Sequence, residues 1–322
     1  MTSTRASTEP SDGRRSWPRS FADRLASPLP GPRQIAKILA EGGFRGAAAD
    51  GDLIPLVRNG FPEIDTGTTA LTWVGHASYV IRMAGRCVLA DPLWSAKLNG
   101  SLRRMTPPGV AWSQLPRIDA VVISHNHYDH LDAATIGRLP RDTPVFLPGG
   151  LGAWFRRRGF TRVVELDWWE SAEVGGLSFD FVPAQHWSRR GPFDSCATLW
   201  GGWVITGGDT RVYHAGDSGY GRRFAEIGRR YPGIDVAMLP IGGYAPRWFM
   251  RAVHMDPEEA VRAGEDVGAR RLASMHWGTF TLTKEPVMEP LHRVRAAWAA
   301  AGRDRDDLWD LAIGETRTLP AP

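Results

Sequence analysis

The sequence predicts an α/β protein with one folded domain, and three observations favour this class. Runs rich in β-branched and aromatic residues alternate with helix-like segments from about residue 68 onward. Hydrophobic residues fill 43% of the 322 positions, enough for a substantial core. No low-complexity linker or short repeat divides the chain after residue 70. We expect a domain at residues 68–322, a helical and irregular lead-in at 33–67, and a disordered, polar extension at 1–32.

The first elements are expected between residues 33 and 123. A helical patch at residues 33–40 precedes the domain. Three strands follow at residues 71–75, 78–82 and 86–90, because β-branched and aromatic residues fill these runs and glycines break them. The apolar run D-A-V-V-I predicts a further strand at residues 119–123.

Strands and helices alternate through the rest of the chain. The clearest helix start is HMDPEEAV, with Asp256 as N-cap, Pro257 at the first helical position and acidic residues in the first turn. Gly268 suits the end of this helix. The same reasoning predicts strands at residues 145–147, 163–166, 177–183, 197–206, 211–215, 236–240 and 271–275, and helices at residues 150–158, 221–230, 256–268 and 287–300.

The run SHNHYDHLD at residues 124–132 places three histidines and two aspartates directly after an apolar strand. Repulsion between carboxylates and the burial of several imidazoles make such a cluster costly unless a cation sits among them. The run therefore predicts a metal site. A purely structural zinc site would be closed by four ligands, often thiolates, whereas this run offers only imidazoles and carboxylates, a pattern that favours catalysis over a structural or binding-only role.

Candidate partners for this run also come directly after predicted strands. His186 follows the strand at residues 177–183, Asp217 follows the strand at residues 211–215, and His276 follows the strand at residues 271–275. Side chains at the ends of adjacent strands meet at one edge of a sheet, where open α/β layers usually bind their ligands.

The motif H-x-H-x-D-H, followed by a lone His, an Asp in a Gly-Asp turn and a final His, resembles the metallo-β-lactamase fold hydrolases. The resemblance implies an αββα sandwich of two mixed β-sheets flanked by helices, with two zinc ions per chain at one edge. Iron and manganese are alternatives that the same donors accept. By this resemblance the first metal is held by His125, His127 and His186, the second by Asp129, His130 and His276, and Asp217 bridges them.

A longer set of segments is similar to the N-acyl-phosphatidylethanolamine-hydrolysing phospholipase D family and its bacterial relatives. These segments are TWVGHASYVI, ADPLWS, SHNHYDHLD, HWSRRGPFD, AGDSGYG, LPIGGYAPRWFM, HMDPEEAV and MHWGTF, and they span about residues 68–300. The resemblance implies a zinc-dependent phosphodiesterase that attacks with a metal-bridging hydroxide. It makes Asp129, Asp217 and His254 the catalytic residues, with His254 assisting at the substrate phosphate, and it places His76 near the metals without making it a ligand.

Apolar and basic residues of the 244–251 loop are expected to contact a lipid substrate. An aromatic and arginine-containing loop at the mouth of the site suits acyl chains or a bilayer surface. The predicted substrate-binding residues are Tyr244, Arg247, Trp248, Phe249, Met250 and His254. The resemblance also implies a homodimer, and we expect peripheral contact with a membrane.

Two other substrate classes stay open on the sequence alone. The same hydroxide could open a lactone, an ester or a β-lactam. RNA ranks last, because the net charge of +4 is spread along the chain and no basic cluster with interleaved aromatic residues occurs, so no nucleic-acid partner is expected. The N-terminus lacks an apolar signal segment, and two cysteines are too few for a disulfide framework, so we expect a cytoplasmic protein that reaches the inner face of the membrane.

Overall fold

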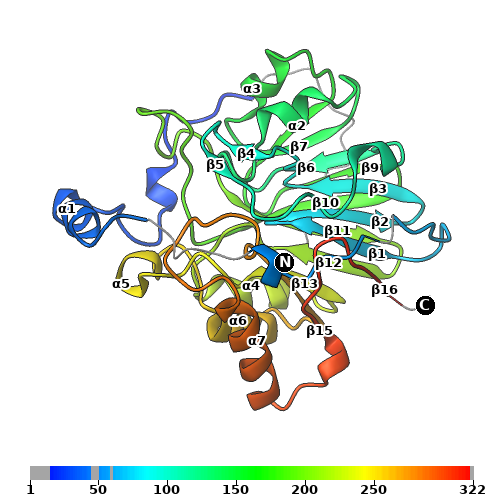
Figure 1. Cartoon of the computed structure of the whole chain (residues 1–322). Helices are drawn as coiled ribbons and strands as arrows, with labels where there is room; N and C mark the ends of the chain where they lie inside the picture. The colour runs from blue at the N-terminus through cyan, green and yellow to red at the C-terminus, as the bar shows by residue number, and fades with distance from the viewer. Residues whose placement is uncertain (1–14, 45–50, 59–60, 320–322) are drawn as a thin grey trace.

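The buried runs form two seven-stranded mixed β-sheets in the computed structural model, which describes residues 15–44, 51–58 and 61–319 (Figure 1). The first sheet has the order β16-β1-β2-β3-β6-β7-β8. Its strands are β1 (Ala70–Gly75), β2 (Ser78–Met83), β3 (Arg86–Ala90), β6 (Ala120–Val122), β7 (Val145–Pro148), β8 (Val163–Leu166) and β16 (Thr316–Thr318). Its β16-to-β3 half is antiparallel and its β3-to-β8 half is parallel.

The second sheet repeats this division, in the order β15-β14-β13-β12-β11-β10-β9. Its strands are β9 (Ser171–Val174), β10 (Leu177–Pro183), β11 (Gly201–Gly207), β12 (Thr210–His214), β13 (Val236–Pro240), β14 (Arg271–Met275) and β15 (Leu308–Trp309). β12 to β15 are parallel, while β9 to β12 are antiparallel. A short hairpin, β4 (Lys97–Leu98) with β5 (Leu102–Arg103), stands apart from both sheets.

The main hydrophobic core lies between the two sheets. Phe146 of the first sheet stacks on Phe179 of the second with ring centroids 4.1 Å apart. Two hydrogen bonds also cross the interface, from Tyr79 Oη to the Ser274 carbonyl (2.8 Å) and from Trp203 Nε1 to the Ile123 carbonyl (3.0 Å). The polar atoms of Tyr79 and Trp203 therefore have partners. Burying these two side chains removes apolar surface from water without leaving an unsatisfied polar group.

Helices cover the outer faces of both sheets (Figure 1). α2 (Ala133–Gly137) and α3 (Gly152–Arg156) pack on the first sheet around a second core that contains Ile136 and Phe155. α4 (Arg223–Arg230), α6 (Pro257–Asp266) and α7 (Glu289–Ala300) cover the second sheet. The expected αββα sandwich is thus confirmed, and so is the start of α6, where Asp256 caps the Glu259 N–H at 2.9 Å.

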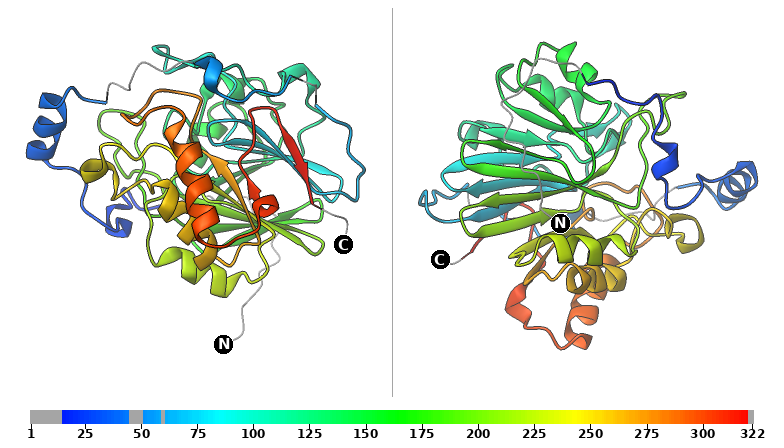
Figure 2. Two further views of the ribbon diagram at one scale, coloured as in Figure 1. Left: turned by 60° about the horizontal axis from the view of Figure 1, so that its bottom comes forward. Right: turned by 180° about the vertical axis from the view of Figure 1, so that it is seen from behind.

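Two further helices, α1 (Pro32–Ala40) and α5 (Arg247–Met250), lie together beside the sandwich, and α1 projects outward from it (Figures 1 and 2). Helix α5 lies within residues 244–251, which the sequence predicts to be a loop. No helix in the described ranges is long and apolar enough to cross a membrane.

Residues 15–25 are packed against the domain, where the sequence predicts disorder. Phe21 is 1% exposed within the main core, and its N–H donates to the Cys196 carbonyl at 2.7 Å. Arg24 pairs with Asp167 at 3.2 Å, which ties down the same segment. One buried aromatic side chain therefore anchors a stretch whose composition is otherwise polar. Residues 1–14 of the expected extension lie outside the described residues.

Replacing Phe21 with alanine is expected to destabilise the protein by about 3 kcal/mol, because a buried phenyl ring is lost and a cavity is left in its place. Denaturant unfolding measures this difference. Phe193→Ala is the matched control, since Phe193 is 99% exposed and its loss should change stability by no more than about 0.5 kcal/mol. Equal stability of the two variants would contradict the buried position of Phe21.

Candidate metal centre

The predicted metal ligands meet at one edge of the sandwich, just past the carboxyl ends of their strands. The loop with His125, His127, Asp129 and His130 follows β6 of the first sheet. Segments after β10, β12 and β14 of the second sheet contribute the other ligands, His186, Asp217 and His276. These three strands run in the same direction, so their carboxyl ends share one edge.

The side chains form two adjoining groups. Within each group the potential ligand atoms lie within 4.8 Å of one another. The first group is His125, His127, His186 and Asp217, and the second is His76, Asp129, His130 and His276. The structure thus assembles all seven residues predicted from the sequence and adds His76 to them.

Asp217 lies between the two groups. Its Oδ2 is 3.9 Å from His125 Nε2 in the first group and 3.2 Å from His130 Nε2 in the second. Its Oδ1 is 3.2 Å from His276 Nε2. The Asp217 side chain is 2% exposed, so its charge must be balanced by groups within the site.

Unsatisfied nitrogen and oxygen atoms show that these residues fit a metal. His127 Nε2, His130 Nε2, His276 Nε2 and Asp217 Oδ1 are buried and lack a hydrogen-bond partner in the described part of the chain. His130 and His276 are close to Asp217 but do not reach it with hydrogen-bond angles. Each unpaired buried polar group costs about 1–3 kcal/mol, and a coordinated cation would satisfy these atoms together.

The electrostatics of the first group suit neutral imidazole ligands. Burial lowers the pKa of His125 well below its usual value, and it lowers the pKa of His127 to about 4 and that of His186 to about 3. These rings are therefore uncharged at neutral pH and keep a lone pair free. A neutral imidazole nitrogen is the form that binds a metal.

The second group contains two histidines whose protonated forms are favoured by nearby carboxylates. Burial opposes protonation of His130 and His276, but the carboxylates around them together outweigh it. Asp217 and Asp129 act on both rings, and they raise the pKa of His130 strongly and that of His276 to about 9. Burial likewise opposes ionisation of Asp129 and Asp217, yet these histidines hold both pKa values well below the usual range. The site therefore requires positive charge, which a bound cation would supply.

Further side chains and carbonyls fix the orientation of the histidines. Asp91, buried directly after β3, accepts from the Ser124 N–H at 2.7 Å and from His130 Nδ1 at 2.7 Å. His186 Nδ1 donates to the Val253 carbonyl at 3.0 Å, which leaves Nε2 facing the site. The sequence reasoning did not assign a role to Asp91, although an acidic residue at the end of a buried strand was visible within ADPLWS. Such partners fix the tautomer and direction of a ligating ring.

His254 is the predicted substrate contact that reaches the centre. It is 8% exposed, and it forms a compact set of potential ligand atoms with Asp217 and His276. Its Nδ1 is buried without a hydrogen-bond partner in the described residues. Burial lowers its pKa to about 3, so the ring is neutral and available to share a hydrogen bond with a bound molecule.

The other predicted substrate contacts mostly have partners within the protein, and their contact with a substrate stays a prediction. Tyr244 is 3% exposed, and its hydroxyl donates to Glu289 Oε1 at 2.7 Å. Arg247 donates to the His254 carbonyl at 2.7 Å and pairs with two acidic residues of α6 and its cap, Asp256 and Glu259. Met250 is buried, Phe249 packs against Phe44, and Trp248 is 40% exposed.

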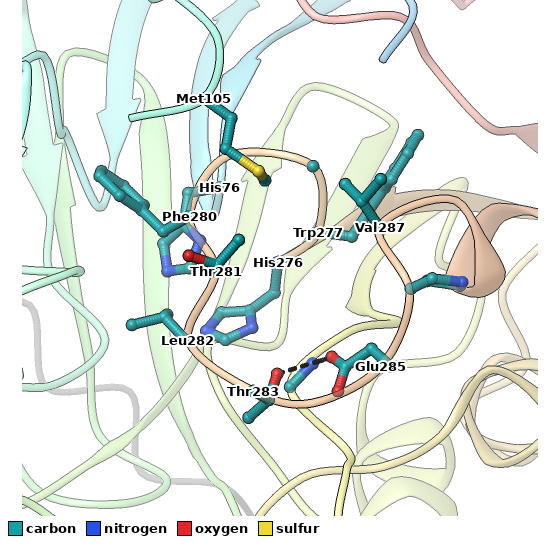
Figure 3. A pocket seen from close by; sticks show the side chains of 13 residues that line it. His76, Met105, His276, Trp277, Phe280, Thr281, Leu282, Thr283, Glu285 and Val287 are labelled. Atoms are coloured by element: carbon teal, nitrogen blue, oxygen red, sulfur yellow. Dashed lines mark hydrogen bonds between the residues drawn. The ribbon is translucent and has the colours of Figure 1, made fainter. Parts of the chain in front are cut away.

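A small pocket adjoins His276 beneath the segment after β14 (Figure 3). Its lining includes Met105, Phe280 and Leu282. Glu285 of the same segment accepts a hydrogen bond from the Gly243 N–H at 2.6 Å, which holds the segment in place. The pocket volume is about 30 Å³, which is room for about two water molecules.

This chain is similar to known proteins both in sequence and in structure. The profile of the beta-lactamase superfamily domain matches residues 86–277. An uncharacterised protein of Mycobacterium tuberculosis is 42% identical over 255 residues, covering 76% of this chain and 68% of that protein. A Caenorhabditis elegans protein named N-acyl-phosphatidylethanolamine-hydrolyzing phospholipase D 1 is 36% identical over 260 residues, covering 75% and 72% of the two chains. Igni18, a metallo hydrolase of Ignicoccus hospitalis, superposes with a TM-score of 0.60 at 26% identity, covering 78% and 98%.

Proposed function

The chain belongs to the beta-lactamase superfamily and is a metal-dependent hydrolase, and from this premise we propose that it is a zinc phosphodiesterase acting on lipids of the N-acyl-phosphatidylethanolamine kind. The observation that carries the proposal is the position of Asp217 between two groups of imidazole and carboxylate donors. The name of the Caenorhabditis elegans relative supports the substrate class.

The donor set suits two zinc ions. The first would be held by His125, His127 and His186 and the second by Asp129, His130 and His276, with Asp217 shared between them. Neither cysteine belongs to these groups, and imidazoles with carboxylates also accept iron or manganese. Two such ions, when bound, lower the pKa of water and polarise a phosphoryl oxygen.

The residues of the chain itself then have three tasks. Asp129, whose side chain is 15% exposed, would accept a hydrogen bond from the attacking water and orient it toward phosphorus. His254 would donate a hydrogen bond to a phosphoryl oxygen, which its neutral ring can do without taking up a proton. Burial of the histidines and of Asp217 excludes bulk water and strengthens each of these interactions.

The substrate proposal is tested with zinc-loaded protein and vesicles that contain N-acyl-phosphatidylethanolamine, with a lactone and a β-lactam in parallel. Mass spectrometry should detect phosphatidic acid together with the N-acylethanolamine. Opening of the lactone or the β-lactam alone would remove the lipid from the proposal and leave the superfamily assignment intact.

A bilayer surface is the partner that we propose for α1 and α5. Leu39 of α1 is 65% exposed, and Ile35, Phe44 and Trp248 around it are each about 40% exposed. Lys37 lies over the Trp248 ring at 4.2 Å, so a basic group accompanies the apolar side chains. Exposed apolar side chains beside lysines are typical of a surface that enters the headgroup region of a membrane.

Replacing Leu39 with glutamate is expected to weaken binding to anionic vesicles by roughly 30-fold, since about 2 kcal/mol of apolar burial is lost. Vesicle sedimentation measures the affinity. Hydrolysis of a soluble, short-chain phosphodiester should stay the same, because Leu39 does not belong to the metal centre. Unchanged sedimentation would contradict the assignment of this surface to a bilayer.

A further inference from the structure

The turn between β1 and β2 contributes a histidine to the second group of donors. His76 follows Gly75 in this turn, lies outside the region matched by the family profile, and is 1% exposed. Its Nε2 is 2.9 Å from Asp129 Oδ2. Its ring lies 4.1 Å from that of His276, and the two rings are neighbours in Figure 3.

The backbone of His76 is fixed from both sides. Its N–H donates to Thr279 Oγ1 at 2.6 Å, and its carbonyl accepts from the His276 N–H at 3.0 Å and from Trp73 Nε1 at 2.8 Å. Its φ of 53° lies in the left-handed region that non-glycine residues rarely adopt. Such a conformation persists where the surroundings over-determine it, so the turn holds the His76 ring in one place.

This ring restrains a carboxylate that is otherwise weakly constrained. A carboxylate offers only acceptors, so His76 Nε2–H is the donor in the bond to Asp129. Asp129 Oδ2 also lies 3.6 Å from His276 Nε2 and 3.8 Å from His130 Nε2. The terminal torsion of an aspartate is broad, and without the His76 donor this oxygen could turn away from the second group.

We propose that His76 is a positioning residue that orients Asp129 and thereby sets the affinity of the second metal position. The inference rests on the proposed dinuclear centre. It concerns one position only, because His76 groups with Asp129, His130 and His276, whereas the first group is oriented by other partners such as the Val253 carbonyl. A ligand's hydrogen-bonding partner of this kind commonly controls metal affinity.

Competition for zinc tests the proposal without any substrate. Zinc-loaded protein is titrated with a chelator, and the released zinc is measured for the wild type, His76→Leu and His76→Gln, with Asp129→Ala identifying the second zinc. His76→Leu should weaken the second zinc by roughly 10- to 100-fold and the first by less than about threefold. His76→Gln keeps an N–H donor at a similar reach and should recover most of the affinity. His292→Leu, at an exposed histidine, is the matched control.

A double variant distinguishes a positioning residue from a metal ligand. In the Asp129→Ala background, His76→Leu should add less than about a twofold loss, because both changes remove the same interaction. A further large loss there would make His76 a ligand and overturn the positioning role. Equal loss of both zincs, equal loss in the Leu and Gln variants, or no loss in a folded Leu variant would also overturn it. Wild-type protein that binds no zinc would overturn the proposed function itself.

Discussion

Replacing Asp217 with alanine is expected to lower hydrolysis by roughly 100-fold or more, because both metal positions lose the carboxylate that they would share. Asp217 is the carboxylate that approaches both groups, at 3.9 Å from His125 and 3.2 Å from His130. Its loss leaves several buried imidazoles without the negative charge that attracts cations. We therefore expect the variant to retain no more than one zinc per chain.

Asp217→Asn separates charge from shape in this prediction. Asparagine keeps the volume and one carbonyl oxygen, so its defect should follow the lost charge rather than a cavity. Asp209→Ala is a matched control in the turn between β11 and β12, where the side chain is exposed. Rates are measured on the vesicle substrate and metal content by elemental analysis. An Asp217→Ala protein with two zincs and full activity would contradict the shared position assigned to this residue.

The candidate metal centre could be predicted from sequence because each segment that carries potential ligands follows a strand. The end of a β-strand fixes where the next residue emerges, so His125, Asp217 and His276 were expected at one sheet edge. Their division between two metal positions came from the resemblance to the metallo-β-lactamase fold hydrolases. Asp91 emerges in the same way after β3. It was not assigned because its partner His130 is 39 residues away, and a lone aspartate carries no spacing pattern.

The 244–251 loop has internal partners that its composition does not reveal. An aromatic and basic composition favours substrate contact only if the side chains have no partner within the protein. Tyr244 finds Glu289, which is 45 residues later in the sequence, and Arg247 finds the acidic first turn of α6. The N-terminal segment is a similar case. Phe21 holds it against the domain by a hydrogen bond to the Cys196 carbonyl, a contact that exists only in the folded protein and that local composition does not reveal.

Removal of metal is expected to lower the thermal unfolding midpoint by roughly 15 °C or more. A ligand present at about 1,000 times its Kd stabilises the folded state by about 4 kcal/mol, so two tightly bound zincs would contribute roughly 8 kcal/mol. For a domain of about this size, each kcal/mol shifts the midpoint by about 2–4 °C. The structure gives a reason to expect tight binding, since the buried Nε2 atoms of His127, His130 and His276 have no hydrogen-bond partner among the described residues.

Calorimetry before and after treatment with a chelator measures this shift, with elemental analysis to confirm release. Zinc should restore the original midpoint, whereas magnesium should not, because it prefers oxygen ligands to imidazoles. Asp129→Ala provides an intermediate case, since it impairs the second position and should lose only part of the shift. An unchanged midpoint after complete release would mean that the unpaired nitrogens find water or each other at little cost. The buried cluster would then be no evidence for a tightly held metal.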